Sequence, residues 1–476
     1  MGAGFSTVTP PPSQVSATSV AQAVWSYTPR SLTDIQSLTA AIQNNDPSLL
    51  STLSDILYVL APYYAGQVSA TQVAAFLDNL ALNYGLAGPA AAAISASPYG
   101  LWSTNFVTQI VPYLSATALN LLLSSGQMDA SHAQLILYWL AQNYYYNEWI
   151  YTVTANAPSS ITFSSNVTLS TNVLIAQNIT IASGVTVTCG TTTCFFVAQS
   201  FNNYGTIVSP YGAPGGAPLD RAGAGGTGGG GIVVIAVTAV LGTLNVSGNP
   251  GGNGTGYSAS GTGGAGAAGI FYVVTGVTVP VGGTGGAGIS ASYIGLPGYN
   301  GGGGGAVGNS YDGGPGGGAT VYSFSSPNAM VTYILQGLSD WWLINVAGKA
   351  PSTTTQLVFM YGSGGGAGAV ASGAEAGGGG GGGAGEVVAY GYNIVSGNIT
   401  AVGGTGGSGV PGCSGCYYGG GGGGGGGLVF IFYGATSGNV TVSLAGGIGG
   451  SGYVIASNGD TGANGTAYIA AVTVNG

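Results

Sequence analysis

Glycine is distributed very unevenly along this chain of 476 residues, and that distribution limits what the chain can fold into. Seven glycines lie in residues 1–160 and the other 88 follow, many in runs such as Gly377–Gly383 and Gly419–Gly427. Collagen is excluded because glycine does not occupy every third position with abundant proline. A glycine run is either a flexible linker or an ordered three-residue helix whose neighbours pack closely because no Cβ intervenes. We favour the second interpretation, packed polyglycine II tracts.

Charged residues are almost missing: they make up 3% of the chain, against roughly 25% in ordinary globular proteins. Three basic and twelve acidic residues give a net charge of −9. Three cations cannot neutralise a phosphate backbone, so we expect no nucleic-acid partner. The mean hydropathy of +0.40 excludes a disordered chain. Because stability depends on pH only through titratable groups, the composition suits a harsh extracellular medium.

The first third of the chain has helical periodicity. Residues 1–30 contain several prolines and predict an extended arm. Apolar residues then recur at i, i+3 and i+4 spacing, as in Leu49, Leu53, Ile56 and Leu60. We therefore expect an all-α helical anchoring domain over residues 31–155. The sequence shows no secretory signal and no apolar run long enough to span a bilayer, so we expect no transmembrane segment and release by virion assembly.

From residue 156 the pattern changes to alternation with a period of two, which predicts short β-strands over residues 156–215. Residues 216–476 then repeat one unit: a glycine tract, an apolar strand, a turn, and a second strand that begins just after Gly242, Gly397 or Gly438. Repetition of one unit predicts stacking. The expected fold class is multidomain α + β, with an N-terminal all-α domain and a repetitive all-β region, solenoid or sandwich-like, with polyglycine II-type tracts.

An aromatic insert over residues 320–361 interrupts the repeat, and we expect binding specificity there or on tyrosine-bearing loops, because aromatic side chains commonly anchor sugars or proteins. If the insert is a strand, Trp341 and Trp342 point to opposite faces. The alternative is that the insert caps or trimerises the stack. The receptor-contact candidates are Trp341, Trp342, Tyr333, Tyr293, Tyr299, Tyr311, Tyr417 and Tyr418.

Other motifs point away from catalysis. Cys189 with Cys194, and Cys413 with Cys416, predict two local disulfides rather than a zinc site. His132 has no partners for a catalytic triad, and no carboxylate pair or phosphate loop is present, so we expect no enzyme activity, cofactor or metal. Seven N-x-S/T sequons are candidate glycosylation sites, several on polar strand faces. They begin at Asn166, Asn178, Asn245, Asn253, Asn398, Asn439 and Asn464.

The alternation of glycine runs, short apolar strands and aromatic-bearing loops resembles the polyglycine II adhesins at bacteriophage tail-fibre tips. The segment VAQAVWSYTPRSLTD, which contains Trp25 and Arg30, is also similar to a short sequence motif of virion fibre-type proteins. The charge depletion looks more like surface proteins of archaea or their viruses. The resemblance implies a virion surface protein (fibre, spike or turret) that contacts host glycan or protein. The arm and helical domain would hold other virion proteins, in a homo-oligomer for which a trimer is expected. The alternative is a purely structural subunit of an archaeal filament or surface layer.

Overall fold

The structure of this chain is a computed structural model that divides into two compact units. One unit consists of Met1–Asn143 with Leu338–Thr354 and Gly476, and the other of Tyr144–Gly337 with Thr355–Asn475. The described residues are 69–83, 85–95, 106–190, 193–210, 223–254, 270–272, 324–355, 357–360, 370–371, 375–409, 419–452 and 458–475. The predicted N-terminal arm lies outside them.

Helices form the first unit wherever it is described, apart from short connections. They are α4 (Ala70–Leu82), α5 (Ala87–Ser95), the π-helical turn η2 (Phe106–Ile110), the 3-10 turn η3 (Val111–Tyr113), α7 (Ala116–Ser124) and α8 (Ala130–Gln142). Polar side chains fix two helix starts: Ser115 caps α7 and Asp129 caps α8 by accepting backbone N–H groups. Leucines from these helices, such as Leu119 and Leu137, are buried.

Helix α9 (Tyr146–Thr154) falls inside the predicted helical domain, 31–155, yet it belongs to the second unit. The reason is packing: α9 contacts strands of the sheet, and Tyr146 meets Tyr390 edge-on with ring centroids 5.4 Å apart. Gln199 of the sheet donates to the Thr154 hydroxyl at 3.0 Å. The aromatic face of α9 therefore covers the sheet.

The prediction that residues 216–476 are all-β is wrong at the aromatic insert. Residues 327–345 form helix α10 (Pro327–Asn345). The physical reason is visible in the sequence, because Met330, Ile334, Leu338 and Trp342 recur every four residues and are buried. An apolar stripe with that period favours a helix rather than a strand.

The second unit is built on one open, ten-stranded sheet whose strand pairs are all parallel. Its strands are β1 (Ser160–Phe163), β2 (Val167–Thr168), β3 (Val173–Ile181), β4 (Thr186–Thr188), β5 (Thr193–Asn203), β6 (Thr206–Val208), β7 (Gly231–Asn245), β12 (Glu386–Thr400), β13 (Leu428–Ser443) and β14 (Thr466–Ala471). Two short antiparallel pairs stand apart: β8 (Ile270–Tyr272) with β9 (Val358–Met360), and β10 (Val370–Ala371) with β11 (Glu375–Ala376).

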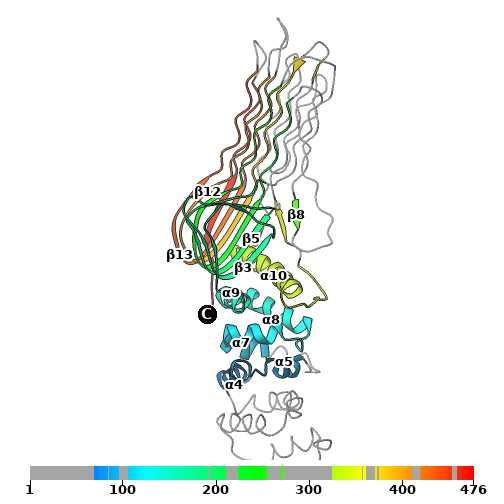
Figure 1. Cartoon of the computed structure of the whole chain (residues 1–476), viewed down its shortest axis with the longest axis vertical. Coiled ribbons are helices and arrows are strands. Elements are labelled where there is room, and N and C mark those ends of the chain that lie inside the picture. Colours follow the sequence, from blue (N-terminus) through cyan, green and yellow to red (C-terminus); the bar gives the residue numbers. More distant parts are fainter. Residues whose placement is uncertain are drawn as a thin grey trace, which may run out of the picture. The chain divides into compact units, whose positions relative to one another are not determined.

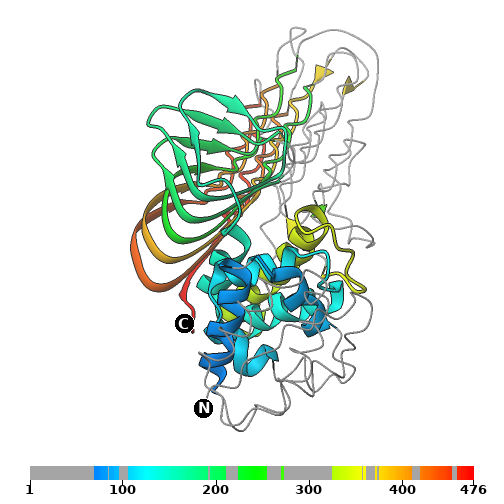
Figure 2. The ribbon, with the colours of Figure 1, turned by 60° about the horizontal axis from the view of Figure 1, so that its bottom comes forward.

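The sheet has two arms. The first arm follows the order β1-β3-β5-β7-β12-β13-β14. In the second arm β2 pairs with β4, β4 with β6, and β6 with the C-terminal half of β7, which in turn pairs with the C-terminal half of β12 and through it with β13. Figures 1 and 2 show the long strands bending as they pass from one arm to the other. The structure thus contains helices and one large parallel sheet that does not close.

Burial along the long strands follows the predicted pattern. The first six residues of β7 and of β12 are buried, as expected where both faces are covered. Beyond the bend the pattern alternates, with Leu244 and Ile399 buried between more exposed neighbours. These two residues pack in one core with Ile232, Val234 and many others from the sheet.

The glycine at the bend does not align every copy of the repeat as the sequence suggests. Gly397 pairs with Gly242, as expected, but its partner on β13 is Val440 rather than Gly438. The copy on β13 is therefore shifted by two residues. Because side chains alternate between faces with a period of two, a shift of two leaves every apolar residue on its correct face.

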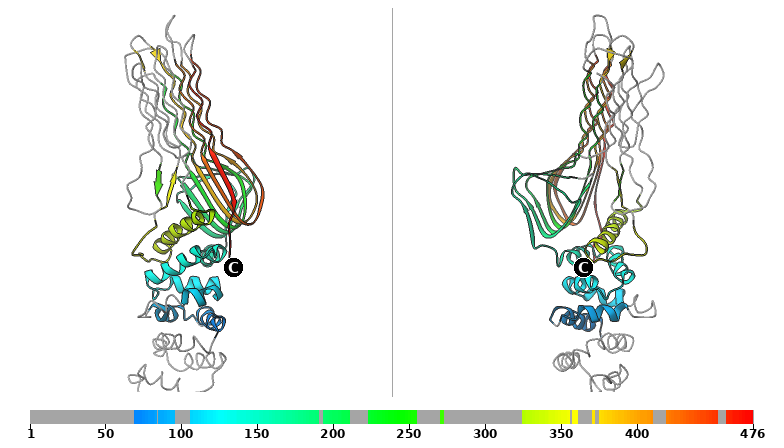
Figure 3. Two further views of the ribbon diagram at one scale, coloured as in Figure 1. Left: turned by 180° about the vertical axis from the view of Figure 1, so that it is seen from behind. Right: turned by 45° about the vertical axis from the view of Figure 1, so that its right-hand side comes forward.

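The described glycine tracts run beside one another and are hydrogen-bonded at every third residue. Residues 378, 381 and 384 donate to the carbonyls of 419, 422 and 425 at 3.2, 2.9 and 2.9 Å. The N–H groups of residues 379, 382 and 385 donate to the carbonyls of 252, 249 and 246 at 2.9, 2.9 and 2.8 Å, so one tract is hydrogen-bonded to two neighbouring tracts. Figures 1 and 3 show these segments as extended traces continuing from the strands. We call this bonded set of tracts (residues 223–230, 246–254, 377–385, 401–409, 419–427, 444–452 and 458–465) the glycine lattice.

Where two tracts of the glycine lattice face each other, there is no room for a side chain. A Cβ on Gly423 would lie 1.7 Å from the carbonyl oxygen of Gly447, and one on Gly424 would lie 2.0 Å from that of Gly382. The contacted atoms are backbone atoms, which cannot rotate away as a side chain can. Glycine is therefore required at these positions by close approach. The lattice ends in asparagines: Asn458 and Asn464 accept the backbone N–H groups of Gly452 and Gly446 at 3.0 and 3.1 Å.

Candidate functional site

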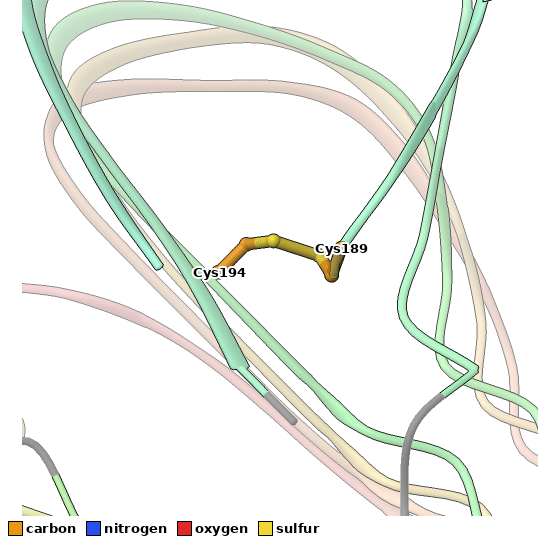
Figure 4. Close-up of a disulfide and its surroundings, with 2 residues drawn as sticks. All are labelled: Cys189 and Cys194. Carbon is orange, nitrogen blue, oxygen red and sulfur yellow. A yellow bond between two sulfur atoms is a disulfide. The ribbon is translucent and has the colours of Figure 1, made fainter. Parts of the chain in front are cut away.

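One of the two predicted cysteine pairs lies in the described residues. Cys189, just after β4, and Cys194, at the start of β5, are joined as a disulfide with Cα atoms 5.7 Å apart (Figure 4). Both residues are fully buried in the core of the sheet unit. The bridge closes the connection between the second arm and the next strand of the first arm. Cys413 and Cys416 lie outside the described residues.

The two tryptophans of the insert differ in burial, although they lie on a helix and not on a strand. Trp342 is 1% exposed and Trp341 is half-buried. Tyr333, also half-buried, holds its ring 5.8 Å from that of Phe324. The structure thus leaves Trp341 as the more accessible receptor-contact candidate and makes Trp342 a core residue. The candidates Tyr293, Tyr299, Tyr311, Tyr417 and Tyr418 lie outside the described residues.

The half of α10 that belongs to the first unit is held by a buried carboxylate. Asp340 is fully buried and accepts hydrogen bonds from the Gln134 amide at 2.8 Å and the Tyr138 hydroxyl at 2.7 Å. The Lys349 ammonium donates to the carbonyls of Ser125 and Met128, both at 2.6 Å. Both groups join the Leu338–Thr354 segment to the rest of the first unit.

His132 also has a structural role. Its backbone N–H donates to Asp129 at 2.8 Å, and its ring contacts the other carboxylate oxygen of Asp129. Burial raises the pKa of Asp129, but the hydrogen bonds from His132 and Ser131 outweigh it and bring the pKa below its usual value. Burial raises the pKa of Glu148, and that of Asp78 despite hydrogen bonds from Ser115. The three carboxylates belong to different helices: Asp78 lies on α4, Asp129 caps α8 and Glu148 lies on α9.

The sequons are explained in part by strand geometry. In N-x-S/T the two polar residues are two positions apart, so on a strand they share a face and the middle residue points the other way. Asn398 and Thr400 flank the buried Ile399 in this way. All seven sequon asparagines are described, and six are exposed while Asn245 is half-buried. The Asn178 amide nitrogen already donates to the Ser159 carbonyl at 2.9 Å, which disfavours a glycan there.

Two rows of outward side chains cross the second arm of the sheet, and we call them the polar array. Strand register aligns the first row as Thr186, Thr206, Thr243, Asn398 and Thr441. It aligns the second row as Thr168, Thr188, Val208, Asn245, Thr400 and Ser443. Ten of these eleven positions carry a hydroxyl or an amide and none is charged. From the sequence alone, these polar strand faces were expected only to carry glycans.

Comparison with known proteins identifies no relative. No family model, no curated protein and no solved structure matches the chain. Within the described residues, three or more His, Cys, Asp or Glu side chains never gather as a metal site would require. The same residues include no helix with the length and apolar character to cross a bilayer.

Proposed function

We propose that this chain is a virion surface protein, a component of a fibre, spike or turret, that attaches the particle to its host cell. The observation that carries the proposal is the glycine lattice, which continues directly from the strands and is bonded at every third residue. Laterally bonded backbones form a stiff extension that needs little side-chain core. A stiff extension is what an attachment protein requires to hold a contact surface away from the particle.

In finer detail, the lattice is a polyglycine II-type packing. Its three-residue hydrogen-bond period supports this assignment. The sheet unit is a solenoid-like stack, since each successive coil pairs its first strand and its second strand with those of the coil before. The helical unit, including the second half of α10, anchors the protein to other virion proteins within a homo-oligomer.

Two further observations support an extracellular place. A disulfide between Cys189 and Cys194 is typical of proteins exposed to an oxidising medium. The surface uses Thr, Asn and Ser where most proteins use Lys and Glu, and this reduces the dependence of stability on pH. An archaeal virus in hot acid fits both observations.

One observation favours the alternative, a structural subunit of an archaeal filament or surface layer. The edge strand β14 leaves Tyr468 45% and Ile469 46% exposed, although their strand partners Phe430 and Ile431 are buried. No charge or proline protects this edge between residues 466 and 475. A filament would cover such an edge by lateral assembly.

The two functions are separated by locating the protein. Antibodies raised against the whole chain should label particles released from a producing culture, and purified protein should bind intact host cells saturably. Heat-unfolded protein is the control for non-specific adhesion. Label confined to cell-attached filaments, with no binding of purified protein to cells, would contradict attachment and support the filament.

A further inference from the structure

The polar array is a regular surface. Neighbouring strands lie about 4.8 Å apart, so the five side chains of the first row span about 19 Å. The two rows are two residues apart along each strand, or about 6.6 Å. No register shift interrupts the pairing of β12 with β7 or β13 beyond Gly397. The hydroxyl and amide groups are therefore held at nearly constant intervals by backbone pairing, not by flexible loops.

The array points outward along its whole length. Between its two rows lie Val187, Ile207, Leu244 and Ile399, each 0% exposed. Because adjacent strand residues face opposite sides, the residues on either side of these four face away from the core. Thr441 donates to Asn398 at 3.1 Å, so neighbouring members of a row already lie within hydrogen-bond reach of one another.

An exposed aromatic ring stands at one end of the strand β6. Tyr204 lies at the bend between β5 and β6, two residues before Thr206 of the first row, and it is exposed between the buried Asn203 and Gly205. Tyr204 is 58% exposed, more than any other tyrosine of the described residues. A free aromatic face beside hydroxyl groups suits stacking against a sugar ring.

We propose that the polar array, with Tyr204, binds a neutral, extended polysaccharide of the host surface. This inference rests on the proposed attachment function and names its ligand class. The array has no cation to hold a phosphate, sulfate or carboxylate group, so charge matching selects a neutral chain. Its members are Thr, Asn, Ser and one Val, with Tyr204 as the one aromatic residue, so it lacks the cluster of aromatic and arginine anchors that is typical of a protein-binding hot spot. A polymer of repeated hydroxyl groups offers donors and acceptors along its length, as the array does.

Each contact is weak, and repetition supplies the affinity. A net hydrogen bond contributes about 1 kcal/mol because water competes for both partners. Contacts after the first are intramolecular when several rings of one chain bind to successive strands, so avidity exceeds the strength of any single contact. Long glycans should accordingly bind more tightly than short ones of the same sugar.

The test removes hydroxyl groups and keeps the fold. In the full chain, Thr206→Val, Thr243→Val and Thr441→Val are combined, because valine keeps the branched shape that strands favour. Tyr204→Ala is made separately. The matched control is Thr162→Val with Thr180→Val, a paired and outward set on the first arm. The probes are dextran, mannan, cellohexaose and chitohexaose, with alginate as the anionic comparison, measured by biolayer interferometry and calorimetry.

The wild-type chain should bind at least one neutral probe, and the triple variant should bind it at least tenfold more weakly with an unchanged melting temperature. Tyr204→Ala should weaken it by a similar factor, and the control should match the wild type. Binding to no neutral probe, binding to alginate alone, or equal binding by the triple variant would overturn the inference. Cell binding without glycan binding would overturn it while leaving the attachment function in place. Glycan binding without cell binding would support binding by the polar array and overturn the attachment function.

Discussion

The substitution Gly423→Ala places one methyl group at one of the two closest contacts of the glycine lattice, the other being at Gly385. The Cβ at position 423 would lie 1.7 Å from the Gly447 carbonyl oxygen, so one backbone must move by about 1.5 Å to restore contact distance. Three lattice hydrogen bonds involve these two residues: from Gly423 to Asp460, from Gly447 to Gly424 and from Gly462 to Gly447, at 2.8, 2.7 and 2.9 Å. All three are strained by the shift.

The cost follows from these contacts. Three weakened hydrogen bonds cost about 3 kcal/mol, and overpacking adds about 1–3 kcal/mol. Lower entropy of the unfolded chain returns about 0.4–1 kcal/mol. The free energy of unfolding of the sheet unit should therefore fall by about 3–5 kcal/mol, measured by urea denaturation. Gly126→Ala is the control, because a Cβ there meets nothing within 4 Å. Equal midpoints for both variants would refute the lattice and make the tract a linker.

Two other predictions concern acid and the insert. The raised pKa values of Asp78 and Glu148 mean that the folded state binds their protons more readily, so stability rises as pH falls through those folded values, and the gain is complete below their ordinary values of 3.8 and 4.5. The lowered pKa of Asp129 has the opposite sign, and its contribution is lost as pH falls through its folded value. The melting temperature of the wild-type chain should therefore change little between about pH 2 and pH 7, and a steep fall in acid would contradict this expectation. Glu148→Gln should raise the melting temperature at pH 7 but not at pH 3. Trp342→Ala should cost about 3–5 kcal/mol of stability because that ring is fully buried. Trp341→Ala should cost clearly less, and equal losses in calorimetry would show that their burial does not differ.

The burial of strand residues could be predicted from the local order of apolar and polar residues. Alternation placed Leu244 and Ile399 inside and their neighbours outside, and an apolar run marked the covered half of β7. The exact register of β13 was not predictable, because a shift of two residues preserves every face. The hydrogen-bond period of the glycine tracts matches the expected helix of three residues per turn, in which backbones can meet on several sides because no Cβ intervenes.

One error was local: the four-residue spacing from Met330 to Trp342 indicates a helix, whereas this segment was expected to belong to an all-β region. The other differences depend on long-range packing. The grouping of α9 with the sheet depends on contacts between distant segments, such as Tyr146 with Tyr390, which no local pattern reveals. The polar array exists only once register aligns six strands between residues 168 and 443. Its members look like ordinary sequons and strand residues in the sequence.

The ordered glycine lattice is the central claim, and hydrogen exchange of its backbone amides tests it most directly. The measurement compares peptides covering Gly419–Gly427 with peptides covering β13, which the tract precedes. In the structure Gly421, Gly424 and Gly427 donate to Gly407, Gly404 and Ala401 at 2.8, 2.8 and 2.9 Å. These amides should exchange as slowly as those of β13, because opening the tract breaks bonds to several neighbours at once. Exchange at the rate of a free glycine peptide, with β13 still protected, would contradict the account.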